Sequence, residues 1–141
     1  MKTFLIIGID PQSIDFTVGK TPPGMTAEKL AAEVEASRQQ FVQQGDRADL
    51  CQVRLDEHAG TLVSEQLARS KYDCILIGGG FRPDSSVPVL EHIINAVHQH
   101  ARDAAISFLS LPRDALAGAA RVLSRDFKDA GLLSASSPVT S

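Results

Sequence analysis

The most unusual run in the sequence is Gly78-Gly79-Gly80, which is followed by Phe81 and Arg82. Glycine can adopt a positive φ and allows a backbone to approach a ligand closely. Backbone amides in such a turn can bind an anion, and a guanidinium can hold a carboxylate or phosphate through two hydrogen bonds. The run therefore predicts an anion site, with a flexible turn beside a solvated arginine as the alternative. The fixed spacings of a Walker loop and of GxGxxG are both missing.

Two carboxylates follow the first apolar run of the chain. Asp10 ends that run, and Asp15 lies in the segment after it. Such a pair could bind Mg²⁺ or act as a general acid and base. Alternatively, Asp10-Pro11 only initiates a turn and Asp15 is a surface charge. Lys20, in the same segment, could reach an anion or remain solvated.

A polar stripe accompanies the apolar residues of the segment after the glycines. Glu91, Asn95, His98 and Arg102 recur at helical spacing, opposite the apolar face. A catalytic role for His98 is one interpretation, but a solvated outer face with i,i+4 pairing explains the stripe more simply. Neither a zinc site nor a GxSxG hydrolase elbow is indicated.

Short apolar runs, typical of buried strands, alternate with segments whose apolar residues recur at helical spacing. Thr26 predicts an N-cap and Gly45 a helix end, so one helix is expected between them. Residues 10–25 carry too many prolines and glycines for a helix and are expected to form a long loop. Strands are expected over 3–9, 48–55, 72–77 and 105–109, and the other helices over 57–70, 87–103 and from Pro112 onward, with Phe127 on the apolar face.

Strict alternation of strand and helix predicts a parallel sheet with right-handed crossovers. The first and third apolar runs belong at its centre, which gives the strand order 2-1-3-4. We therefore expect a three-layer α/β/α fold with a four-stranded parallel sheet, a shortened flavodoxin-like or Rossmann-like arrangement. Ligands of such sheets bind at the switch in strand order, here outside the carboxyl ends of strands 1 and 3. The residues expected to line the site are Asp10, Gly78, Gly79, Gly80, Arg82 and Ser110.

The composition suits one globular domain, with 141 residues of which 43% are hydrophobic and 22% charged. We expect this domain over residues 1–130 and a flexible tail over 131–141. The net charge is −3 and the 14 Lys and Arg residues are scattered, which argues against a nucleic-acid partner. No apolar run suits a membrane span or a signal peptide. Cys51 and Cys74 are expected to be buried free thiols, which suits the cytoplasm.

Four motifs stand out together: GIDP at 8–11, PPGM at 22–25, YDCILIGGGFR at 72–82 and INAVH at 94–98. They resemble a group of small uncharacterised bacterial proteins with a flavodoxin-like α/β fold, and the similarity covers most of residues 1–125. In that group Asn-Thr often follows the fourth strand, where this chain has Leu109-Ser110. The resemblance supports the fold, implies no activity or cofactor, and draws attention to Asn95 and His98.

Three hypotheses for function follow. The first is a cytoplasmic binding or regulatory module for a small anionic ligand at the ends of strands 1 and 3. The second is a small enzyme in the same cleft, with Asp10 or Asp15 as the acid-base group and Arg82 as the anion clamp. The third is a homodimeric interaction protein without a ligand, because the fourth strand would leave an exposed sheet edge.

Overall fold

The four strands lie in one parallel sheet with the order β2-β1-β3-β4. A computed structural model describes residues 1–16, 23–81 and 86–124 of the chain. Ile7 of the central strand aligns with Cys51 on one side and Ile77 on the other. The strands are β1 (Thr3–Ile9), β2 (Arg47–Val53), β3 (Cys74–Ile77) and β4 (Ala105–Phe108).

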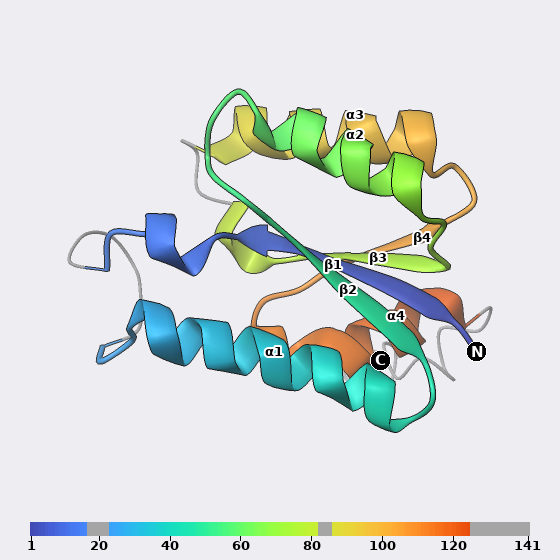
Figure 1. Ribbon diagram of the computed structural model, residues 1–141, viewed down its shortest axis with the longest axis horizontal. Coiled ribbons are helices and arrows are strands. Elements are labelled where there is room, and N and C mark those ends of the chain that lie inside the picture. Colours follow the sequence, from blue (N-terminus) through green and yellow to red (C-terminus); the bar gives the residue numbers. More distant parts are fainter. Residues whose placement is uncertain (17–22, 82–85, 125–141) are drawn as a thin grey trace, which may run out of the picture.

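Helices cover both faces of this sheet (Figure 1). On one face lie α1 (Ala27–Gln43) and α4 (Ala115–Leu123), and on the other lie α2 (Ala59–Arg69) and α3 (Val87–His100). This is the three-layer α/β/α arrangement that the sequence predicts, and the strand order is confirmed. Since α1 leaves β1 on one face and α3 leaves β3 on the other, the two connections diverge at the carboxyl ends of these strands.

Alternate residues of β1 enter two separate hydrophobic cores. Leu5 and Ile7 belong to the core that includes residues of α2 and α3, whereas Phe4 and Ile6 belong to the core that includes Phe41 of α1. All four β1 side chains are buried. Burial on both faces explains why this strand appears in the sequence as a continuous apolar run rather than as an alternating one.

Helix α1 begins and ends where its local signals predict. The Thr26 hydroxyl accepts a hydrogen bond from the Lys29 amide at 3.1 Å, which satisfies one of the free donors of the first turn. Gly45 follows the helix with φ of +94°, a conformation that favours glycine. These two residues explain the helix bounds without reference to tertiary contacts.

The main local difference from the sequence prediction lies after β1. Residues Pro11–Ser13 form a 3₁₀ turn inside the segment expected to be a loop. The Asp10 carboxylate accepts the Gln12 amide at 3.0 Å, and the fixed φ of Pro11 suits the first helical position. Helix α3 is also shorter than expected and ends at His100.

Several expectations fall on residues outside the described ranges, namely those for Lys20, Arg82, Phe127 and residues 131–141. Within the described ranges, no helix combines the length and apolar character that crossing a bilayer requires.

Candidate functional site

The carboxyl ends of the central strands are tied together by backbone hydrogen bonds. The Gly78 amide donates to the Ile7 carbonyl at 2.8 Å, which joins the end of β3 to β1. The Leu109 amide donates to the Ile77 carbonyl at 2.8 Å, which joins β4 to β3. The segments after β1, β3 and β4 therefore begin side by side at this edge of the sheet.

The glycine run forms a tight turn against its neighbours rather than an open loop. Residues Gly79–Phe81 make a 3₁₀ turn whose Phe81 side chain is fully buried. A Cβ on Gly79 would lie 2.9 Å from the carbonyl oxygens of both Leu109 and Ser110. A Cβ on Gly80 would lie 2.6 Å from Cδ1 of Ile9. Close packing of backbone on backbone thus requires glycine at position 79.

The glycines of this run do not use the positive φ that glycine allows. Among the described residues only Gly24 and Gly45 have one. The physical reason is that the chain continues from β3 into a right-handed turn, which ordinary residues could also adopt. What excludes other residues at Gly79 is the space taken by the end of β4.

Asp10 serves the turn after β1. Its amide donates to the Val53 carbonyl at 2.7 Å, its carbonyl accepts the Ser13 hydroxyl at 2.7 Å, and its carboxylate caps Gln12. These contacts match the turn-initiator interpretation of Asp10-Pro11. They hold the Asp10 side chain at the strand end, half-buried, next to the region of the glycine turn.

The other residues expected at the site are placed less closely together. Ser110 is exposed and reaches the glycine turn through its carbonyl, which lies near Gly79. Asp15 is exposed and lies beyond the 3₁₀ turn that follows Asp10. Arg82, the expected anion clamp, lies outside the described residues. The structure therefore brings Asp10, the glycines and Ser110 to one edge of the sheet.

Ser86 is a residue at this edge that the sequence prediction missed. It is the N-cap residue of α3, its side chain is only 1% exposed, and its hydroxyl has no hydrogen-bond partner among the described residues. An N-cap serine normally accepts an amide of the first helical turn. Ser86 adopts helical dihedral angles, φ −99° and ψ −7°, and makes no such bond. The signal in the sequence was Ser-Val-Pro at 86–88, a cap residue followed by a first-turn proline.

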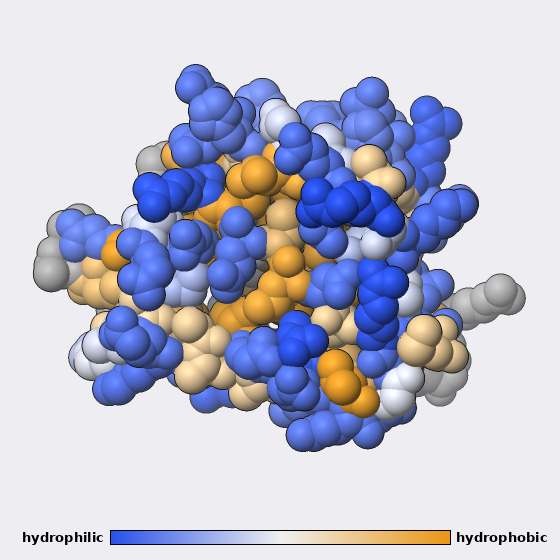
Figure 2. All heavy atoms as spheres, viewed as in Figure 1, coloured by the Kyte–Doolittle hydropathy of each residue, from blue (hydrophilic) through white to orange (hydrophobic). Residues whose placement is uncertain are grey.

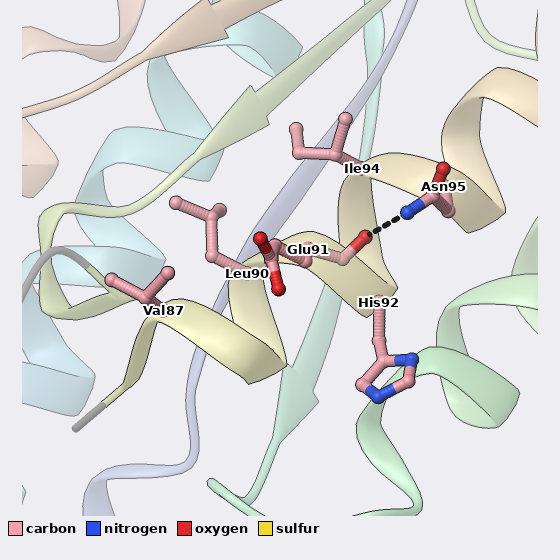
Figure 3. A pocket seen from close by; sticks show the side chains of 6 residues that line it. All are labelled: Val87, Leu90, Glu91, His92, Ile94 and Asn95. Atoms are coloured by element: carbon pink, nitrogen blue, oxygen red, sulfur yellow. Dashed lines mark hydrogen bonds between the residues drawn. The ribbon is translucent and has the colours of Figure 1, made fainter. Parts of the chain in front are cut away.

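The outer face of α3 carries two open hollows. Figure 3 shows Leu90 and Ile94 extending from the same side of α3, whereas His92 extends in the opposite direction. The Asn95 amide donates to the Glu91 carbonyl at 2.9 Å, so its side chain folds back on its own helix. One hollow is lined by Val87, Leu90, Glu91, His92, Ile94 and Asn95. The second, toward β4, is lined chiefly by Ile94, His98, Ala101, Arg102 and Ile106.

A network of polar side chains lies at the opposite edge of the sheet, around Asp49 of β2. The Asp49 carboxylate accepts from the Arg47 guanidinium at 2.8 Å and from the Tyr72 hydroxyl at 2.6 Å. The bond from Arg47 has the larger effect, and together these bonds hold the pKa of Asp49 below its ordinary value. Burial, and then the bond to Asp49, raises the pKa of Tyr72. Figure 2 shows this face of the molecule, where hydrophobic atoms between the helix layers are framed by hydrophilic ones.

The two cysteines are buried and form no disulfide, as expected. They lie in different cores, Cys51 with α2 and α3 and Cys74 with α1 and α4. Burial raises the pKa of both thiols, that of Cys74 to about 12, which keeps them protonated at neutral pH. Within the described ranges, no group of three or more His, Cys, Asp or Glu residues is arranged to hold a metal ion.

Comparison of the chain with protein-family models and with curated proteins gives no match. The resemblance to small bacterial proteins therefore stays a prediction from the motifs quoted above.

Proposed function

We propose that this protein is a binding module for a small anionic ligand, held beside the first turn of α3 at the carboxyl edge of the sheet. The observation that carries the proposal is the buried hydroxyl of Ser86, which has no hydrogen-bond partner among the described residues. A buried hydroxyl without a partner costs about 1–3 kcal/mol. An acceptor that reaches this group would recover that cost.

The helix that begins at Ser86 supplies the electrostatic part of the site. The first amides of an α-helix have no partner within the helix, and the helix dipole favours negative charge there. Val87 and Val89 each contribute an amide to this turn, whereas Pro88 contributes none. A carboxylate or phosphate group matches two amides and one hydroxyl, because its oxygens accept hydrogen bonds from all three.

The topology supports the same location. The order β2-β1-β3-β4 agrees with the shortened flavodoxin-like sheet that the sequence predicts, and its connections diverge between β1 and β3. Ligands of open α/β sheets bind at such a switch point. Gly80 is exposed in the turn that leads from β3 toward α3. Arg82 stays a sequence-based prediction for the anion clamp.

Substitution of Ser86 by alanine tests the proposal with inorganic phosphate as the probe. We expect free Ser86→Ala to be more stable than the wild type, because the variant no longer buries an unpaired hydroxyl. We also expect its affinity for phosphate to fall roughly 10-fold, the usual effect of losing one hydrogen bond to a charged group. Denaturant unfolding measures the first effect and calorimetric titration the second.

Ser64→Ala in α2 is the control: it should leave the affinity for phosphate unchanged and raise stability by no more than the roughly 0.5 kcal/mol that alanine adds in a helix interior. Absence of saturable phosphate binding to the wild-type protein, or equal binding by Ser86→Ala, would refute the proposed site. A loss of stability in free Ser86→Ala would show that the hydroxyl has a structural partner. Amide shifts confined to residues 78–80, 86, 87 and 89 in a nuclear magnetic resonance titration would locate the probe as proposed.

The enzyme hypothesis has less support from the geometry. The Asp10 carboxylate is engaged by the Gln12 amide, and Asp15 is exposed beyond the following turn. Asp10→Asn would remove turnover if Asp10 were the acid-base group, with binding retained. We therefore propose a binding or regulatory role rather than an enzymatic one. We also propose that the protein acts in the cytoplasm, since its two buried free thiols are compatible with a reducing compartment.

A second candidate function is self-association into a homodimer, favoured by the uncharged outer edge of β4. Phe108 on this strand is 47% exposed. We expect Phe108→Glu to shift a dimer to monomer in sedimentation velocity. Val42→Glu, at a residue of α1 that is 42% exposed, is the control and should leave the dimer intact.

A further inference from the structure

The two edges of the sheet differ in how they are protected against pairing with a strand of another chain. β2 carries Arg47 and Asp49, whose side chains form an ion pair at 2.8 Å. β4 has the sequence Ala-Ile-Ser-Phe and no charged residue. Charged side chains on an edge strand discourage pairing with another chain. The β4 edge lacks this protection and is the edge at which association is expected.

Apolar side chains continue from β4 onto α3. Phe108 is exposed, and Ile106, two residues earlier and therefore on the same face of the sheet, is half-buried. On α3, Val87 is exposed, and Leu90 and Ile94 are half-buried along the same side of the helix (Figure 3). We call these five residues the α3–β4 patch. Both hollows of the surface border it.

Charged residues beside the patch are arranged so that a second copy complements the first. Glu91 lies in the N-terminal half of α3, whereas His98 lies in its last turn and Arg102 just beyond its end. All three side chains are exposed. If two α3 helices run antiparallel, with a two-fold axis near Ile94, Glu91 of each copy lies beside the basic end of the other. A parallel pair in register would instead place like charges together.

We propose that two copies of this chain associate through the α3–β4 patch, with their α3 helices antiparallel and Glu91 of each copy paired with the His98–Arg102 end of the other. The inference rests on the self-association proposed above and specifies its partner and geometry. The arrangement is isologous, so each charge pair occurs twice and the assembly closes at two copies. The apolar patch supplies the buried area, and the charges set the direction.

Charge reversal tests the arrangement of the two α3 helices separately from the question of whether a dimer forms. Glu91→Arg places like charges at both symmetric contacts, and so does Arg102→Glu; both residues are exposed, so the fold should be retained. We expect each variant alone to dimerise at least roughly 10-fold more weakly than the wild type. An equimolar mixture of the two variants should recover dimers, because every contact then joins opposite charges. Sedimentation velocity measures all four samples, and Glu65→Arg in α2 is the control.

The possible outcomes separate the two proposals. A monomeric wild-type protein overturns self-association and, with it, this arrangement. A wild-type dimer that is unaffected by either charge reversal keeps self-association but refutes the antiparallel α3 pair. Variants that weaken the dimer without recovery on mixing would refute the pairing of Glu91 with the basic end. If the two variants form dimers only when mixed, and Glu65→Arg dimerises like the wild type, the proposed geometry is supported.

Discussion

At the scale of single residues, Gly79 illustrates how tightly the carboxyl edge of the sheet is built. A Cβ at this position would lie 2.9 Å from two backbone carbonyl oxygens, which cannot rotate away. We expect Gly79→Ala to lower the free energy of unfolding by about 1–3 kcal/mol, the usual cost of overpacking. Denaturant unfolding measures this change.

Gly8→Ala is the matched control for that substitution. Gly8 lies in β1 at the same edge, and a Cβ there would meet nothing within 4 Å. The control should therefore cost little or slightly stabilise the protein, since alanine restricts the unfolded chain more than glycine does. Equal effects of the two substitutions would contradict the close packing described for the glycine turn.

The Asp49 network gives a prediction for the pH dependence of stability. The pKa of Asp49 is lowered in the folded protein, chiefly by the bond from Arg47. A carboxyl with a lowered pKa stabilises the fold above its unfolded pKa of about 3.9, and this contribution is lost as the pH falls through the folded pKa. We expect Asp49→Asn to be less stable than the wild type at pH 7, with the difference shrinking in acid. Denaturant unfolding across that pH range measures it.

Glu65→Gln, at an exposed position of α2, is the control for Asp49→Asn and should differ little from the wild type at any pH. A difference for Asp49→Asn that stays constant from pH 7 into acid would indicate lost packing rather than a lost charge interaction.

At the scale of elements, α1 is the one whose bounds depend most clearly on local signals. Thr26 accepts the Lys29 amide at the helix start. Thr26→Ala should therefore cost about 1 kcal/mol of stability, while Thr26→Ser should retain most of it because serine is an equally good cap. Thermal unfolding of the two variants measures the difference. Equal losses would mean that the threonine methyl group, rather than the hydroxyl, stabilises this end.

The elements also show why part of the candidate site could not be predicted. Strand order followed from apolar runs and strict alternation, which are local patterns. The need for glycine at position 79 could not be predicted, because it comes from the carbonyl oxygens just after β4, about 30 residues further along the chain. Likewise Ser-Val-Pro at 86–88 is only a local signal for a helix start, whereas the lack of a partner for the Ser86 hydroxyl among the described residues is a property of the tertiary structure. The interpretation of Asp10-Pro11 as a turn initiator agrees with the structure, because a turn depends only on neighbouring residues.

At the scale of the whole molecule, the core determines how much of the chain the domain requires. α4 is the last element of the described chain, and Ala115 and Ala119 on it are buried in the core that also contains Leu76 of β3. The Ser124 amide donates to the Ala120 carbonyl at 3.1 Å at the end of this helix. Both buried alanines lie well before residue 131, so the core described here should be complete without the last eleven residues of the sequence.

We therefore expect a chain of residues 1–130 to have the same free energy of unfolding as the full chain, measured by denaturant unfolding. A chain that ends at Asp114 should fail to fold cooperatively, because it leaves one face of the central strands uncovered beside α1. A loss of stability on removing residues 131–141 alone would show that they contribute to the fold.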